Sequence, residues 1–198
     1  MRFFKKLIFA TIIIFIHNSC SCSNCINEES VIPYLVLSKA DNFIASKTGP
    51  SFFQNYIKPD FSKIRKIENG YLLVYNLFIP EKPFVKGEIR FSVDTLGNVF
   101  ENMEIFGIPL CKDFPEDCNF KVDKEQVKKI AKDYGLEEGI KEWKIGFLYD
   151  VVYQKYVWHV LATLSESEGE FGYRASGKEL IISPSDGKVL QKNDWKIN

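Results

Sequence analysis

Residues 178–190, KELIISPSDGKVL, contain the pattern that decides the fold. Residues 178–183 predict a β-strand, 184–187 a turn and 188–191 the start of a second strand, because apolar runs bounded by Pro, Ser, Asp and Gly are typical of hairpins. Residues 88–99, EIRFSVDTLGNV, show a similar pattern earlier in the chain. The sequence therefore predicts two related hairpins.

The two hairpins keep a fixed interval. Three positions recur ninety residues later, Gly87 at Gly177, Gly97 at Gly187 and Val99 at Val189. A fixed interval of this kind predicts a structural repeat. The expected helices and central strands are offset by slightly less, so the later loop is longer in the second copy. The alternative is a chance similarity between two hairpins with glycine turns.

The first copy predicts one helix followed by four antiparallel strands. Gly49-Pro50 ends the helix, since glycine tolerates the left-handed cap and proline cannot continue the helix. The apolar residues of the helix fall at helical spacing, and they are Leu35, Val36, Ala40, Phe43 and Ile44. Strands are expected at 64–68, 71–79, 88–93 and 99–105. The first two flank Asn69-Gly70, a favoured pair for a two-residue turn with positive φ at both positions. Three aromatic residues after the helix are expected to complete the core: Phe52, Phe53 and Tyr56.

The second copy predicts the same order. Asp123 and Gln126 make a capping-box start for a helix that Gly135 ends. One face of this helix is apolar and carries Val127, Ile130, Ala131 and Tyr134. Strands are expected at 142–149, 153–164, 178–183 and from 188 onward. The polar residues 165–177 are expected to form a loop.

These patterns predict an α+β fold of two tandem modules, each with one helix packed on a four-stranded antiparallel sheet. The modules are expected at 30–105 and 122–198. Residues 106–121, which contain Pro109 and Pro115, are expected to form a connection stapled by a disulfide.

Three segments of the second copy resemble a PepSY-type domain. They are the helix 125–135 (EQVKKIAKDYG), the aromatic strand 156–160 (YVWHV) and the hairpin 180–190 (LIISPSDGKVL). The resemblance covers roughly 122–192 and, more loosely, 31–105. The hairpin of the family usually has Asp before the turn, where the first copy has Asp94 and the second Ser183-Pro184. The resemblance implies a helix across an antiparallel sheet, and it implies binding of partners such as proteases rather than chemistry.

The N-terminus is typical of a secretory signal peptide over residues 1–19. Arg2, Lys5 and Lys6 precede ten uncharged residues, 7–16 (LIFATIIIFI). This run suits the apolar region of a signal and is too short to span a bilayer, which takes about 20 residues. The alternatives are a short N-terminal anchor helix and a buried strand. Loss of these three cations leaves 23 basic and 26 acidic residues, a net charge of about −3.

The cysteines are also typical of an exported protein. Ser19-Cys20 after the apolar run resembles the signal of bacterial lipoproteins, in which the cysteine is acylated, although His17 stands where that family prefers Leu. Lipidation of Cys20 would anchor the protein to a membrane through a flexible tether, residues 20–29. The alternatives are plain cleavage and an anchor that is never cut. Cys111 and Cys118 are expected to form a local disulfide, because four cysteines remain and export favours pairing. Cys22 and Cys25 have the spacing of a redox motif, but lie in the tether.

No catalytic residues, cofactor site or metal site are readable. His159 is the single histidine beyond the signal, and a zinc site needs a cluster of Cys and His. The acidic pairs, such as Glu137-Glu138, fall in expected loops, where solvated carboxylates are common. Equal numbers of basic and acidic residues, 26 of each, argue against nucleic-acid binding. Phe171 and Tyr173, in the expected loop, are candidate partner-binding residues, because exposed aromatics commonly anchor interfaces. The alternative is that they fold back on the sheet.

The sequence therefore predicts an exported, lipid-anchored, non-enzymatic binding protein of a bacterial cell envelope. The expected partner is an envelope protein, and a protease that is inhibited or regulated is the candidate. The alternatives are a toxin-neutralising lipoprotein of the immunity type and an enzyme with an unrecognised site.

Overall fold

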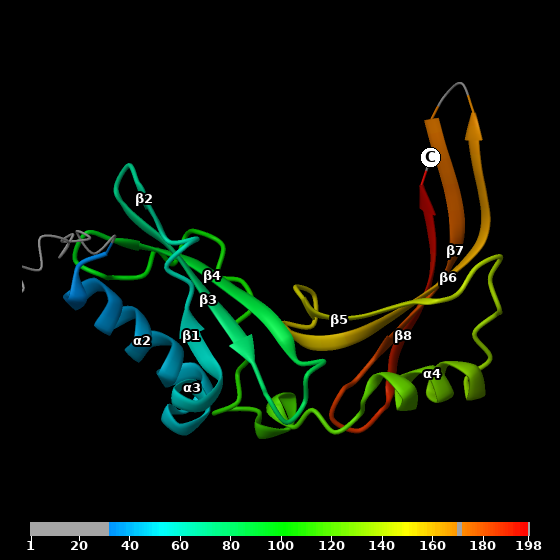
Figure 1. Cartoon of the computed structure of the whole chain (residues 1–198), viewed down its shortest axis with the longest axis horizontal. Helices are drawn as coiled ribbons and strands as arrows, with labels where there is room; N and C mark the ends of the chain where they lie inside the picture. The colour runs from blue at the N-terminus through cyan, green and yellow to red at the C-terminus, as the bar shows by residue number, and fades with distance from the viewer. Residues whose placement is uncertain (1–31, 170–171, 198) are drawn as a thin grey trace, which may run out of the picture. The chain divides into compact units, whose positions relative to one another are not determined.

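The structure is a computed structural model that describes residues 32–169 and 172–197 (Figure 1). Within these residues the fold is α+β, with three α-helices and two four-stranded antiparallel sheets, which confirms the predicted class. In chain order the elements are α2 (Tyr34–Thr48), α3 (Pro50–Tyr56), β1 (Ile57–Pro59), β2 (Arg65–Ile67), β3 (Gly70–Phe78), β4 (Lys86–Asp94), the short 3-10 helix η1 (Pro115–Cys118), α4 (Lys124–Asp133), β5 (Lys144–Asp150), β6 (Lys155–Gly169), β7 (Gly172–Ile182) and β8 (Val189–Ile197). None of the helices in this described part is long and apolar enough to cross a membrane.

In the first sheet β3 is the central strand. β4 pairs along one edge of β3, while β1 and β2 pair with successive halves of the other edge. Helix α2 buries Val36, Ala40 and Ile44, which are spaced by four residues and therefore share one face. Leu35, which we expected on that face, is exposed because it lies one residue out of this register.

Three expectations for the first sheet are corrected. Residues 99–105 form no strand: Val99 makes an isolated bridge to Val93, and the chain then turns at Phe100, whose carbonyl accepts from the Met103 amide. The fourth strand is the three-residue β1. The β2–β3 turn consists of 68–69, since Ile67 pairs with Gly70, and neither turn residue has a positive φ.

Gly49 ends α2 with a φ of 86°, as predicted. Pro50 does not simply stop the helix but starts a second one, α3, where its missing N–H costs nothing. The first sheet therefore has two helices rather than one. Phe52, Phe53 and Tyr56 lie on α3 and pack, partly buried, against the core, as expected.

In the second sheet the strand order is β5-β6-β7-β8 and α4 packs against it. The predicted capping box is present, with the Gln126 amide donating to Asp123 and the Asp123 amide donating to the Gln126 side chain, each at 2.9 Å. Val127 and Ala131 are buried, but Tyr134 is exposed. The expected loop at 165–177 is wrong, because β6 and β7 run on through it as a long hairpin.

Aromatic side chains join the two sheets. Tyr156 of β6 is buried within the core of the first sheet, and its hydroxyl donates to the Gly107 carbonyl at 3.0 Å. The Tyr156 ring stacks on Phe147 and meets Phe120 edge-on. A disulfide joins Cys111 to Cys118 in the segment before α4, with their Cα atoms 5.4 Å apart.

The Asp94 turn provides a test of pH dependence. The carboxylate accepts from the Asn98 amide, the Asn98 side chain and the Leu96 amide, each at 2.8 Å, and these bonds hold the pKa of Asp94 below its ordinary 3.8. A lowered pKa means that this stabilisation is complete above the ordinary value and is lost as the pH falls through the folded value. We expect Asp94→Ala to lower the free energy of unfolding at pH 7, and the difference from wild type to shrink below pH 3.8.

Chemical denaturation across this pH range measures the effect. Asp113→Ala is the control, because Asp113 is exposed and its side chain makes no hydrogen bond within the described residues. An Asp94→Ala difference that stays constant down to low pH would contradict the assignment.

Candidate functional site

The residues singled out from the sequence fall in different places. Cys20 and Phe171 lie outside the described residues, as do Cys22 and Cys25. Tyr173 lies on β7 with 46% of its surface exposed, so it does not fold back into the core. Its hydroxyl donates to the Glu166 carboxylate at 2.8 Å, and Lys141 pairs with the same carboxylate.

Tyr173 belongs to a part of the second sheet that we call the ribbon, residues 165–169, 172–176 and 195–197. In the ribbon β6, β7 and β8 continue past the first residue of β5, Lys144, which pairs with Leu161 (Figure 1). Most side chains of the ribbon are exposed. A hollow of about 390 Å³ lies on it, lined by Ser165, Glu166, Ser167, Arg174, Ala175, Ser176, Lys196 and Ile197.

A second polar cluster surrounds His159 on β6. Its Nδ1 lies 2.5 Å from Glu179 Oε1 on β7, and its Nε2 lies 3.3 Å from Asp150 Oδ2 at the end of β5. All three side chains are less than one fifth exposed. Only the contact of Nδ1 with Glu179 has the geometry of a hydrogen bond, and Nε2 is buried without a hydrogen-bond partner among the described residues.

The cluster continues across the sheet to β8. The Glu179 carboxylate accepts from the Asn193 side-chain amide at 3.4 Å, and Asn193 Oδ1 accepts from the Gln191 side-chain amide at 2.7 Å. Gln191 Oε1 in turn accepts from the Tyr153 hydroxyl at 2.9 Å. The network thus ties the β5–β6 turn to the far edge strand. His159 lines neither of the two hollows described for this chain.

The His159 network predicts a measurable coupling. We expect His159→Ala to lower the free energy of unfolding by about 1–3 kcal/mol, because two largely buried carboxylates lose their partner. A double-mutant cycle with Glu179→Ala should give a coupling of about 0.5–3 kcal/mol. The control is a cycle with Glu81→Ala, an exposed residue near the first sheet, which should be additive. Additivity in both cycles would show that the His159–Glu179 contact contributes nothing.

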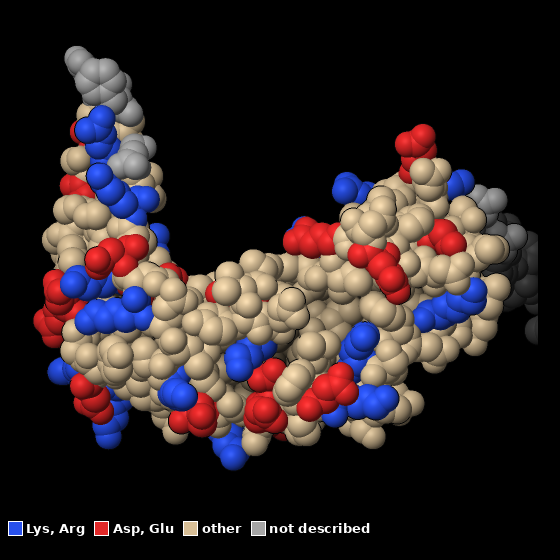
Figure 2. All heavy atoms as spheres, turned by 180° about the vertical axis from the view of Figure 1, so that it is seen from behind, with Lys and Arg blue, Asp and Glu red and all other residues tan. Residues whose placement is uncertain are grey.

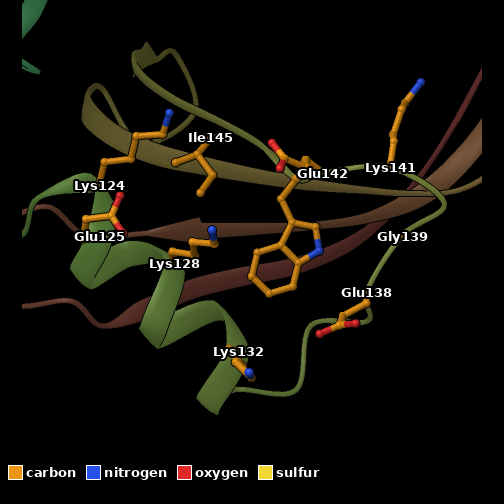
Figure 3. A pocket seen from close by; sticks show the side chains of 10 residues that line it. Lys124, Glu125, Lys128, Lys132, Glu138, Gly139, Lys141, Glu142 and Ile145 are labelled. Carbon is orange, nitrogen blue, oxygen red and sulfur yellow. The ribbon is translucent and has the colours of Figure 1, made fainter.

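A larger hollow, of about 440 Å³, lies between α4 and the segment that leads into β5 (Figure 3). We call it the α4 groove. Lys124, Lys128 and Lys132 line it from α4, while Glu138 and Glu142 line it from the opposite side. Trp143 and Ile145, both half-buried, supply its apolar lining. Sequence analysis missed this groove, although the spacing of the three lysines by four residues places them on one helix face.

The surface carries basic and acidic side chains side by side on the face shown in Figure 2. Within residues 32–169 and 172–197, no group of three or more His, Cys, Asp or Glu side chains is placed to hold a metal ion.

No protein-family model and no curated protein matches the chain.

Proposed function

We propose that this protein is a non-enzymatic binding protein of a bacterial cell envelope. Its N-terminal signal exports it, and a lipid on Cys20 holds it at the membrane. It binds another envelope protein, and a protease that it inhibits or regulates fits the PepSY-type resemblance.

The ribbon is the observation that carries this proposal. Strands gain stability when a helix or second sheet covers a face, and a ribbon of two or three strands is marginal by itself. Residues 165–169 of β6 have β7 on one side and no strand on the other within the described residues. Free strand edges with exposed side chains favour pairing with another protein. Tyr173 and Arg174 are exposed there.

A tandem arrangement of two modules, over 30–105 and 122–198, is part of the proposal. The turns after β4 and β7 have similar hydrogen bonds, although the second turn is one residue longer. The Asp94 amide donates to the Asn98 carbonyl and the Gly97 amide to the Asp94 carbonyl, while the Ser183 amide donates to the Lys188 carbonyl and the Gly187 amide to the Ser183 carbonyl. Both turn glycines have positive φ, 84° and 76°.

The glycines of the two turns also have similar neighbours. A Cβ on Gly97 would meet α2, and a Cβ on Gly187 would meet Ile130 of α4. Each turn therefore lies against the helix of its own module, which supports a repeat.

Affinity capture tests the function. The mature domain, immobilised through its N-terminus, is exposed to envelope extract, and the captured protein is purified and its affinity measured directly. The double variant Tyr173→Ala/Arg174→Glu should weaken binding about tenfold or more, since aromatic and Arg residues dominate interface energies. Tyr34→Ala/Arg65→Glu is the matched control, because it makes the same exposed changes on the first module. Equal binding by both variants would refute the ribbon as the binding surface.

The captured partner also separates the first alternative, since a toxin would indicate an immunity-type lipoprotein. The acid-flanked His159 favours the second alternative, an enzyme. Hydrolysis of an envelope substrate that His159→Ala abolishes, with no protein captured, would replace binding with catalysis.

A further inference from the structure

We propose that the α4 groove binds an extended acidic segment of a partner protein, which pairs with the outer edge of β5 as an additional strand. This inference goes beyond the proposed function, because it assigns a second site and the chemistry of its ligand.

The outer edge of β5 has no strand partner within the described residues. β5 is an end strand of its sheet and pairs with β6 alone. Within the described residues, no backbone group of β5 makes a backbone hydrogen bond outside that pairing. β4 also packs against β5, and near the end of β5 Tyr149 meets Phe106 edge-on. The part of β5 proposed to accept a further strand is therefore its start, where Ile145 lines the α4 groove. An exposed edge next to a helix can accept a peptide through main-chain hydrogen bonds.

The α4 side of the groove is positively charged. Lys124, Lys128 and Lys132 are exposed on α4 and line the groove, and none of them forms an ion pair with the described residues. Lys141, also at the groove, is already paired with Glu166. The cations without partners are thus gathered on the α4 side, so acidic side chains of a ligand would point toward α4.

The spacing of the three lysines matches that of alternate residues in an extended chain. Successive lysines four residues apart on a helix are separated by about 6 Å along its axis. Alternate residues of an extended chain, which share one face, are separated by about 6.6–6.8 Å. Three acidic residues at alternate positions therefore match the three lysines, and the methylene groups of glutamate would cover Trp143 and Ile145. The three acidic lining residues, Glu125, Glu138 and Glu142, would repel a ligand that is acidic on both faces.

Calorimetric titration of the mature domain with a blocked peptide that alternates threonine with three glutamates tests the proposal. Binding should weaken about tenfold in Lys128→Glu, because a favourable pair becomes a like-charge contact. Lys129→Glu is the matched control, since Lys129 is exposed on the same helix outside the groove, and it should bind within about twofold of wild type. Circular dichroism confirms that both variants fold.

Two modified peptides separate charge from strand pairing. The glutamine version should bind much more weakly, and so should a peptide N-methylated at the amides that would face β5. If the glutamine peptide bound as tightly as the glutamate peptide, the role of charge would be overturned. If the N-methylated peptide did so, strand pairing would be overturned, and absence of peptide binding would overturn the whole proposal. Binding of phosphatidylglycerol vesicles that depends on Lys128, without peptide binding, would identify a membrane-facing surface instead. Tyr173→Ala/Arg174→Glu should bind the peptide normally, so failure of the ribbon proposal remains distinguishable.

Discussion

Tyr156→Ala should lower the free energy of unfolding by about 3–5 kcal/mol, because the ring is fully buried and its loss leaves a cavity. The residue sits on β6 of the second sheet but in the core of the first, where it contacts Phe120 and Phe147. Its removal therefore weakens the junction between the sheets as well as the packing within one of them. Thermal and denaturant unfolding, followed by circular dichroism, measures the loss.

Two companion variants define the origin of the Tyr156 effect. Tyr156→Phe keeps the ring but leaves the Gly107 carbonyl without its donor, so it should cost about 1–3 kcal/mol. Tyr34→Ala removes the same type of side chain from a position that is 84% exposed, and should change stability by less than about 0.5 kcal/mol. If Tyr156→Ala matched Tyr34→Ala, the junction would contribute nothing to stability.

Gly177→Ala should also be strongly destabilising. A Cβ at Gly177 would overlap the Ala162 carbonyl oxygen on β6 and lie 2.9 Å from the Trp195 ring on β8. Backbone on one side and a ring on the other leave little room for relaxation. We therefore expect a loss of about 1–3 kcal/mol or more, as for other overpacked sites.

Gly146→Ala is the matched control, because it introduces the same methyl group in the same sheet. The nearest atom to its Cβ would be Leu148 Cδ2 at 3.9 Å, which is an ordinary contact. Alanine is favoured over glycine within strands by about 0.5–1 kcal/mol, so this variant should be neutral or slightly more stable. Equal stability of the two alanine variants would contradict the close approach at Gly177.

Local signals predicted both ends of α4 well, because capping acts within a few residues, but they placed the β2–β3 turn one residue too late. Asp123 with Gln126 predicted the start of α4, and Gly135 its end, because capping depends on neighbouring backbone groups. The loop predicted at 165–177 was wrong because pairing between distant residues, and not a local signal, decides the structure there. Its polar residues are typical of a loop, yet Thr163 pairs with Gly177 and Gly177 with Trp195, so partners distant in sequence hold them as strands. Single-sequence patterns do not contain that information.

Some residues of the candidate sites could be chosen from the sequence, and others only from the structure. Tyr173 could be chosen from the sequence as an aromatic residue in polar surroundings, and the structure leaves it exposed. The partners of His159 could not be chosen, because Asp150 and Glu179 come from two other strands and meet it only through strand register. The spacing of the three lysines of α4 could be read from the sequence. The groove could not, because it forms only where residues 138–145 lie opposite the lysine face of α4.

The sequence by itself determined the α+β class, the boundaries set by capping and turn residues, and the cysteine pair that is bonded in the structure. These follow from interactions between neighbours in the chain, whose geometry a short pattern specifies. Only the tertiary structure decided that Tyr156 belongs to the core of the other sheet, that polar residues extend β6 and β7, and that β5 leaves an edge open beside α4. Those features depend on which distant segments pair and pack, because the free energy of burial and strand pairing is shared among residues far apart in sequence.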